Sequence, residues 1–137
     1  MTQKDKELLL RDLSARLPYG VKIKNISKIS KLTSINTKYS IIVESDEIDK
    51  NFFNLPRLDI LEIEVAKPYL FPMSSMTEEQ EKEFDQLLEL ELKAISDGID
   101  HTEVTAFEID FYNKHHLDWR GLIKKGLAID ATGLNIY

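Results

Sequence analysis

The chain has 137 residues, a formal net charge of −6 at pH 7 and no cysteine. A chain of this length is expected to form one domain, 1–137, that buries about two-thirds of the surface its unfolded form exposes. The lack of cysteine excludes disulfides and thiolate metal sites, and it suits a reducing compartment. The first twenty residues are too charged for a secretory signal, and no apolar run is long enough to span a bilayer. We therefore expect a cytoplasmic protein without membrane contact.

Charge is divided unevenly along the chain. Residues 1–43 contain nine Lys or Arg against three Asp or Glu, whereas residues 44–137 contain nine against twenty-one. Two solvated faces that attract each other within the fold explain this division, and we favour that reading. The alternative is a basic surface for an anionic partner.

The first 43 residues predict one helix followed by three strands. Thr2 and Asp5 can satisfy the free N–H groups of a first helical turn, and leucines at helical spacing follow until Pro18. From Val21 the apolar period changes to two, as in a half-buried strand. We predict an antiparallel meander of three short strands, over 21–24, from about residue 31, and over 39–43.

The next segment, 44–57, has no clear period and is predicted to be a loop or a short irregular insertion. Its Phe52 and Phe53 are expected to fold back and cap the sheet, with a partner-binding patch as the alternative. Alternation returns over 60–65, which predicts a fourth strand. Lys67 precedes a proline and is expected to be extended, leading the chain out of the sheet.

The second half of the chain predicts two helices. Thr77 and Gln80 form a capping box, and the helix they begin should end at Gly98. A further helix is expected over about 103–115, with Thr102 as its cap. The inward residues of the first are predicted to be Phe84, Leu87, Leu88, Leu92 and Ile95, and those of the second Phe107, Phe111 and either Val104 or Ile109.

After these two helices, a short helix is predicted over 119–125. Asp118 can accept hydrogen bonds from its first turn, and Gly126 can take the left-handed conformation that ends it. Residues 127–129 are predicted to be a strand or an extended docking segment. The terminal residues 133–137 could pair with a sheet edge, either in their own chain or in a neighbouring one.

These elements predict the α+β class: an N-terminal helix, a bent antiparallel sheet of about four strands, two C-terminal helices and a short capped turn. Closure of the sheet toward a small partial barrel stays open as an alternative. The chain is expected to be sheet-rich over 18–67, helical over 77–126 and extended over 127–137.

Three segments carry a likeness to known sequences: KPYLFPMSSMTEE over 67–79, DWRGLI over 118–123 with GLA after it, and the LPYGV turn over 17–21. In these segments the chain resembles a family of short proteins, without an assigned activity, from gut anaerobes and their prophages. It departs from them most between residues 25 and 56. The resemblance implies a small single domain in such cells or phages, and it carries over neither an activity nor functional residues.

One cluster has the side chains that metal sites and acid–base pairs use: His115, His116 and Asp118. Their spacing argues against that use, because ligand pairs on one helical face usually sit three or four residues apart. Histidines at the end of a helix also have a structural explanation, since they bond its last carbonyls. No cofactor is expected.

Three classes of function follow. The first, which we favour, is an interaction or accessory protein that binds a protein partner or itself, with a candidate interface of Trp119, Arg120, Phe52 and Phe53. The second is a nucleic-acid-binding protein, whose candidate contacts are Lys22, Lys24, Lys28, Lys31 and Lys38. The third is a small metal-dependent enzyme that uses His115, His116 and Asp118.

Overall fold

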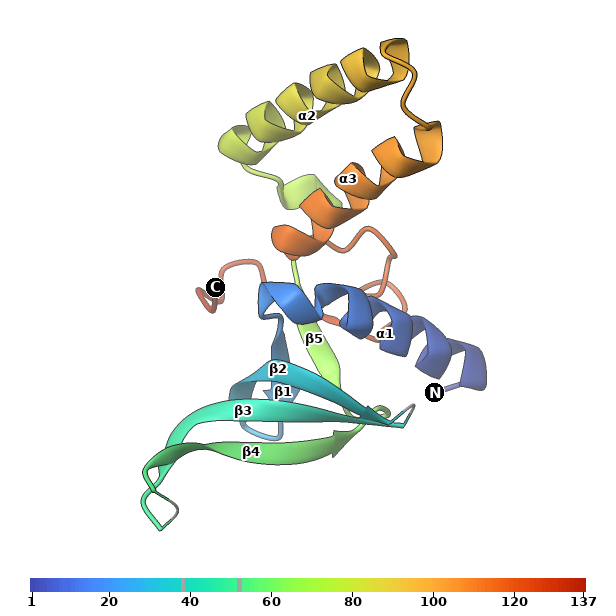
Figure 1. Cartoon of the computed structure of the whole chain (residues 1–137). Helices are drawn as coiled ribbons and strands as arrows, with labels where there is room; N and C mark the ends of the chain where they lie inside the picture. The colour runs from blue at the N-terminus through green and yellow to red at the C-terminus, as the bar shows by residue number, and fades with distance from the viewer. Residues whose placement is uncertain (38, 52) are drawn as a thin grey trace.

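The computed structural model of the chain describes residues 1–37, 39–51 and 53–137, and in the range 101–104 it describes the backbone alone. It confirms the α+β class, with an N-terminal helix and two further helices (Figure 1). The helices are α1 (Gln3–Arg16), α2 (Glu78–Ser96) and α3 (His101–Lys114), with the short turns η1 (Leu17–Tyr19) and η2 (Met73–Ser75). The strands are β1 (Lys22–Asn25), β2 (Lys28–Thr37), β3 (Ser40–Asp49), β4 (Leu55–Glu62), β5 (Lys67–Leu70) and β6 (Ile129–Asp130).

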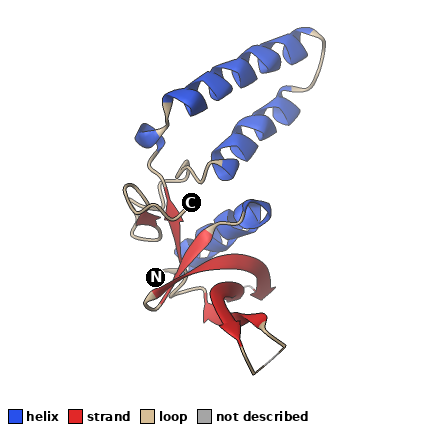
Figure 2. Ribbon diagram, turned by 90° about the vertical axis from the view of Figure 1, so that its left-hand side faces the viewer, coloured by secondary structure: helices blue, strands red, loops and turns tan. Residues whose placement is uncertain are grey.

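The strands form one six-stranded mixed sheet in the order β4-β3-β2-β1-β5-β6. The antiparallel meander is confirmed, since β1 pairs with β2, β2 with β3 and β3 with β4. The count of about four strands is too low, because β5 joins β1 and the short β6 then pairs with β5 in parallel. The sheet is bent but not closed, and Figure 2 shows its strands curling around the inner face.

The prediction that Lys67 leads the chain out of the sheet is wrong. Lys67 is extended, but it lies opposite Lys24 in β1, so the chain re-enters the sheet as β5. The residue before a proline is biased toward an extended conformation, and that conformation suits a strand as well as an exit from the sheet. A proline near the beginning of a strand costs only one ladder hydrogen bond, and this strand keeps its pairing with β1.

The prediction of a loop over 44–57 is also wrong. β3 continues to Asp49 and β4 begins at Leu55, so most of this segment belongs to a long hairpin. The register shifts between Glu44 and Ile48, and such a bulge hides the alternation on which a strand is recognised. Phe53 lies at the hairpin tip with 87% of its surface exposed, so it does not cap the sheet, and Phe52 lies outside the described residues.

The main core lies between α1 and the inner face of the sheet. The predicted capping box of Thr2 and Asp5 is present, and Leu9 and Leu13 on α1 are fully buried. The remaining core residues come from the strands, from the residues that flank them and from the C-terminal segment: Val21, Ile23, Leu32, Ile41, Val43, Ile63, Ala66, Leu70, Leu122, Leu127 and Ala128. The chain end is therefore part of the body that holds α1 on the sheet.

Helices α2 and α3 form a hairpin that projects away from the sheet (Figures 1 and 2). The capping box of Thr77 and Gln80 is confirmed, and Gly98 with φ +90° follows the end of α2. None of the helices in the described parts of the chain is apolar over the length that crossing a bilayer needs. The two ends of the hairpin meet at Phe71, which donates to the carbonyl of His116 and accepts from the N–H of Asp118.

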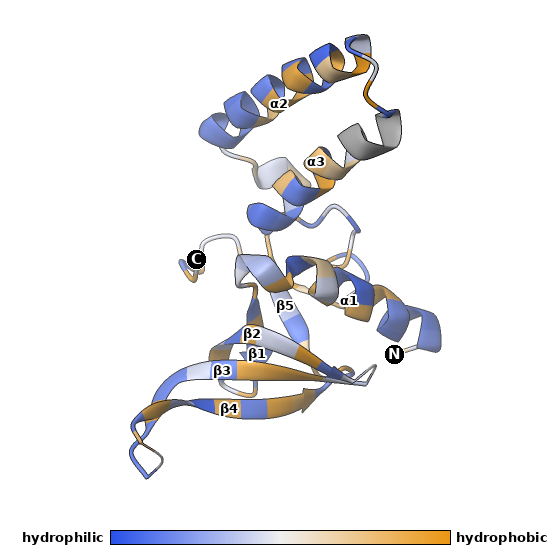
Figure 3. Cartoon of the chain, viewed as in Figure 1, coloured by the Kyte–Doolittle hydropathy of each residue, from blue (hydrophilic) through white to orange (hydrophobic). Residues whose placement is uncertain are grey.

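The buried face predicted for this hairpin is only partly correct. Phe84, Leu87 and Leu88 are half-buried and Phe111 is buried, and hydrophobic colour continues along α2 away from the sheet (Figure 3). Three residues expected to point inward are exposed instead: Leu92 (69%), Ile95 (40%) and Phe107 (50%). The outer half of α2 has only α3 beside it, which leaves part of its wide apolar stripe uncovered. The predicted cap Thr102 and the predicted inward residue Val104 have side chains outside the described residues.

The segment after α3 contains turns where a short helix was predicted. Gly121 has φ +71°, a left-handed conformation that interrupts a helix over 119–125. Gly126 also has φ +71°, as predicted, and Asp118 accepts from the N–H groups of Leu122 (2.7 Å) and Ile123 (2.9 Å). The cap therefore organises a compact turn that leads directly into β6.

Candidate functional site

The three residues proposed as metal ligands or as an acid–base pair each have a structural partner. His115 points to α2, where its Nε2 lies 2.9 Å from Glu83 Oε2 and its Nδ1 lies 3.3 Å from Gln80 Nε2. Because the carboxylate can only accept, Nε2 carries the proton and Nδ1 accepts from the amide. Asp118 is occupied by the turn that it caps.

His116 points to the chain end instead. Its ring stacks on that of Tyr137, with centroids 3.8 Å apart and planes 16° apart. Burial, together with the nearby charge of Arg16, lowers the pKa of His116 to about 4, so the imidazole is neutral at pH 7. Among the described residues, no group of three or more His, Asp or Glu side chains is arranged to hold a metal ion.

Trp119 and Arg120, predicted as interface residues, are half-buried and make contacts within the chain. Trp119 Nε1 donates to Asn113 Oδ1 at 3.0 Å, and the Arg120 guanidinium lies 4.0 Å from the centre of the indole ring. Arg120 Nε also lies 3.3 Å from Asp12 Oδ1 on α1. These contacts join α1, α3 and the C-terminal turns, which is a structural role.

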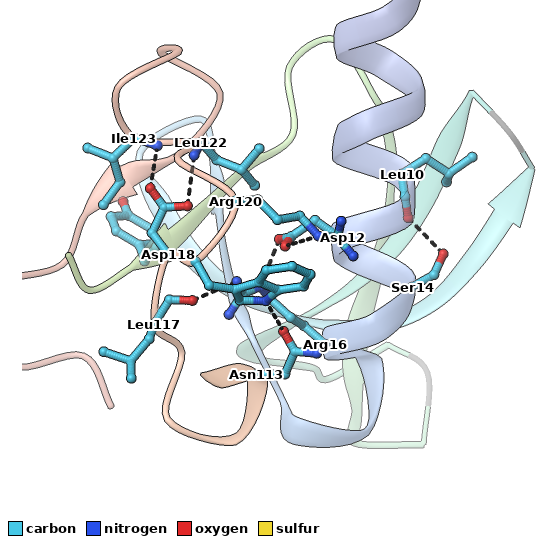
Figure 4. A network of polar contacts seen from close by, with 12 residues as sticks. Leu10, Asp12, Ser14, Arg16, Asn113, Leu117, Asp118, Arg120, Leu122 and Ile123 are labelled. Atoms are coloured by element: carbon cyan, nitrogen blue, oxygen red, sulfur yellow. Dashed lines mark hydrogen bonds and ion pairs between the residues drawn. The ribbon is translucent and has the colours of Figure 1, made fainter. Parts of the chain in front are cut away.

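The centre of this network is a fully buried ion pair on α1 (Figure 4). Arg16 Nε donates to Asp12 Oδ2 at 2.7 Å, and Arg16 Nη2 donates to the carbonyl of Leu117 at 2.8 Å. The spacing of four residues was visible in the sequence. The burial of the ion pair could not be predicted, because it depends on the C-terminal turns that cover both side chains.

The lysines proposed to contact nucleic acid lie on β1 and β2. The strand register places Lys22 opposite Lys31 on the outer face of the sheet, and Lys24 lies opposite Lys67 on β5. Lys28 pairs with Glu47 at 2.6 Å. Lys38 lies outside the described residues. Lys67 was not among the predicted contacts, because its strand was not recognised.

The projecting hairpin carries an apolar groove that the sequence analysis missed. We call this the hairpin groove; it has a volume of about 330 Å³. α2 contributes one row of side chains and α3 a second, each at the spacing of one helical face. The lining residues are Glu83, Gln86, Leu87 and Leu90 of α2, Phe107, Asp110, Phe111 and Lys114 of α3, and Tyr19 of η1.

Aromatic packing holds the two helices of the groove together. The ring of Phe84 lies 5.2 Å from that of Phe111 and 5.6 Å from that of Tyr112. An ion pair of 2.9 Å between Lys114 and Glu83 joins the helices across the groove. The hydrogen bond from Lys114 holds the pKa of the Glu83 carboxyl below its usual range.

The groove is apolar within acidic surroundings. Leu90 is 64% exposed and Phe107 is half-exposed, so apolar surface is open to solvent at its outer end. α2 carries seven carboxylates against two lysines. The excess of leucines on α2 was a signal in the sequence, because Leu87, Leu88, Leu90 and Leu92 cover more than the one face that a single contact can bury.

Comparison with protein-family models, with curated proteins and with solved structures gives no match for this chain.

Proposed function

We propose that the protein is an interaction module whose hairpin groove binds an amphipathic, basic helix of a partner protein. The observation that carries this proposal is an open apolar groove between two antiparallel helices, with Leu90 and Phe107 exposed at its outer end. A helix that lays leucine-sized side chains into such a groove is a common mode of recognition.

The chemistry of the partner follows from the charges around the groove. α2 carries seven carboxylates against two lysines, which gives a net negative field. At the groove itself Lys114 pairs with Glu83, and Asp110 adds a further carboxylate. Lysines and arginines flanking the apolar face of a partner helix would complement this field. An acidic helix with the same apolar face would be repelled, so charge provides the discrimination.

Two leucines of α2 that are two positions apart provide a matched test. Leu90 lines the groove and Leu92 does not, although both belong to the same helix and have nearly equal exposure (64% and 69%). The probe is an 18-residue Leu/Lys peptide designed to be amphipathic and helical, with a Leu/Glu peptide as its charge control. Binding is measured by fluorescence anisotropy at physiological salt.

We expect the Leu/Lys peptide to bind with micromolar affinity and the Leu/Glu peptide to bind far more weakly. Leu90→Glu should weaken binding by roughly tenfold or more, since it introduces a charge into the contact, whereas Leu92→Glu should change it less than about twofold. Equal losses in both variants, or no binding of the Leu/Lys peptide, would show that the groove is not the docking site.

Nucleic-acid binding is a second candidate function, supported by one observation. Lys22 and Lys31 lie side by side on the outer face of the sheet, with Lys24 on the same face of β1. Neutralising Lys22 and Lys31 together should abolish binding to a 20-nucleotide single strand at low salt, and the affinity should fall steeply as salt is added. A protein that shows no binding to this strand at low salt would exclude the role.

Membership of the family from gut anaerobes and prophages, and a location in the cytoplasm, remain part of this proposal. Both are compatible with a small adaptor that acts on a protein partner. Expression of the tagged chain in an anaerobe of that kind, followed by cell fractionation, tests the location; recovery in the membrane or culture fluid would contradict it.

A further inference from the structure

The bent sheet leaves an open gap between two strands that follow one another in the chain. β4 ends at Glu62 and β5 begins at Lys67, but β5 pairs with β1 and not with β4. In the described parts of the sheet, β4 pairs only with β3 and is an edge strand. Its outer backbone groups are therefore available to a further strand.

The curl of the sheet turns this edge toward β1. Asn25, at the end of β1, donates to Asp59 Oδ2 on β4 at 3.0 Å, although β2 and β3 lie between these strands in the sheet order. Two pockets of about 460 and 270 Å³ lie along the gap, and they share Ile26 and Leu61. We call this gap the seam. It is lined by Lys24, Asn25, Ile26, Ser27 and Lys28 on one side, by Arg57, Asp59, Ile60 and Leu61 on the other, and by Glu64, Val65 and Lys67 at its end.

The seam exposes apolar side chains together with the backbone edge. Ile26, at the turn between β1 and β2, is 89% exposed, and Ile60 and Val65 are also exposed. These side chains suit a bound strand, whose alternate residues would face them while its backbone pairs with β4. Pro56 limits such pairing at the start of β4, which leaves the part from residue 57 onward.

The unbalanced charges of the seam are positive. Lys28 pairs with Glu47, Arg57 with Asp59, and Glu64 with Lys6, which accounts for the carboxylates that line it. Lys24 and Lys67 lie directly opposite each other, and the residues described by the structure give neither of them a carboxylate partner. Like charges at opposed positions destabilise a sheet, so a bound carboxylate would relieve the repulsion between them.

From this geometry we infer that the seam binds an extended acidic segment of a partner protein, which adds to β4 as a further strand. Its backbone pairs with the free edge, its apolar residues contact Ile26 and Ile60, and its carboxylates lie beside Lys24 and Lys67. The site is separate from the hairpin groove and takes a partner of opposite charge, so it stands whether or not the groove binds a basic helix.

Two pairs of lysines give a matched test. Lys24 and Lys67 line the seam, whereas Lys22 and Lys31 form an equivalent cross-strand pair outside it. The probe is a capped nine-residue peptide of alternating valine and glutamate, with a valine/lysine peptide as its control. Affinity is measured by titration, and backbone amide exchange over residues 57–62 reports pairing with β4.

We expect the valine/glutamate peptide to bind and to slow exchange in the amides of β4. The double variant K24Q/K67Q should lose roughly fivefold or more in affinity, and K22Q/K31Q should stay within about twofold of the parent protein. Both variants should fold, because each removes a repulsion between like charges.

Several results would overturn the inference. Equal binding of the valine/lysine peptide, equal losses in the two double variants, or unchanged exchange along β4 would each do so. Concentration-dependent protection of the β4 amides without peptide would assign the seam to a second copy of the chain. A single-stranded nucleic acid of 20 nucleotides provides a last comparison. If it displaces the peptide, and if K22Q/K31Q weakens its binding as much as K24Q/K67Q does, the basic face would be assigned to nucleic acid.

Discussion

The buried pair of Asp12 and Arg16 gives the sharpest prediction for stability. Both side chains are fully buried, and among the described residues the guanidinium of Arg16 makes one other hydrogen bond, to the carbonyl of Leu117. Replacing Asp12 with leucine leaves the guanidinium inside the protein without its counter-charge. The same change removes the carboxylate that lies beside Arg120.

The size of the effect follows from this burial. Removing one partner of a buried ion pair costs about 3–5 kcal/mol, because the remaining charge cannot be solvated. That is a large part of a total stability of about 5–15 kcal/mol. For a chain of this size it corresponds to a fall in Tm of roughly 10–15 °C. Replacing both partners, as in D12L/R16M, removes the stranded charge and should recover much of the loss.

The assay is urea unfolding followed by circular dichroism, with the melting temperature as a second measure. Glu47→Gln, which breaks the exposed pair with Lys28, is the matched control and should cost less than about 1 kcal/mol. If Asp12→Leu costs no more than this control, or if D12L/R16M is as unstable as the single variant, the pair is not held as tightly as its burial implies.

Three further predictions concern the C-terminal segment. The pKa of His116 is about 4 in the folded protein against 6.5 when free, so the unfolded chain takes up the proton at higher pH than the folded one. The contribution of His116 to stability should be constant well above pH 6.5 and should fall as the pH drops toward 4. The full shift corresponds to about 3 kcal/mol, and with allowance for the partial exposure of the ring we expect a fall of about 2 kcal/mol. His116→Phe should flatten this dependence in urea unfolding at several pH values, and an unchanged slope would contradict the assignment. Tyr137→Phe removes a hydroxyl that donates to the carbonyl of Tyr69 at 2.7 Å and accepts from the N–H of Lys22 at 2.9 Å. The change should cost about 1 kcal/mol by thermal unfolding, and no change in Tm would mean that these two hydrogen bonds do not stabilise the docked tail. Asp118→Ala leaves two backbone N–H groups without their acceptor and should cost about 2 kcal/mol, with faster amide exchange confined to residues 119–126; a loss spread evenly over the protein would argue against a local cap.

The features predicted correctly are those that neighbouring residues determine. The caps at Thr2, Thr77 and Asp118 depend on side chains within five positions of the backbone groups they bind, and Gly98 and Gly126 mark chain reversals for the same local reason. β1 and the first part of β3 followed from alternation, whereas two register shifts against β3 interrupt the period of β2. Local chemistry is therefore sufficient for these elements.

The features predicted incorrectly depend on contacts far along the chain. β5 exists because β1 and β6 pair with it, and the partner of Tyr69 in β6 is Ile129. The exposure of Leu92 and Phe107 depends on how far the hairpin stands from the body, which no local pattern records. The hairpin groove and the seam were missed for the same reason. Each lies between elements whose relative positions cannot be predicted from local sequence patterns.

The backbone contact between Phe71 and the chain around Leu117 has a consequence for how the lengths of α2 and α3 can vary. Residues 72–116 leave the body and return to it at the same end of the hairpin, where two backbone hydrogen bonds of 2.9 and 2.8 Å join the two chain segments. Trp119, which bonds Asn113, and Tyr19, which lines the hairpin groove, contact the hairpin near this end as well. Matched changes in the length of α2 and α3 at their far ends would therefore leave these contacts and the sheet in place. Each added residue extends a helix by about 1.5 Å. The length of the hairpin of α2 and α3 is therefore a property that insertions and deletions at its far end can change separately from the sheet.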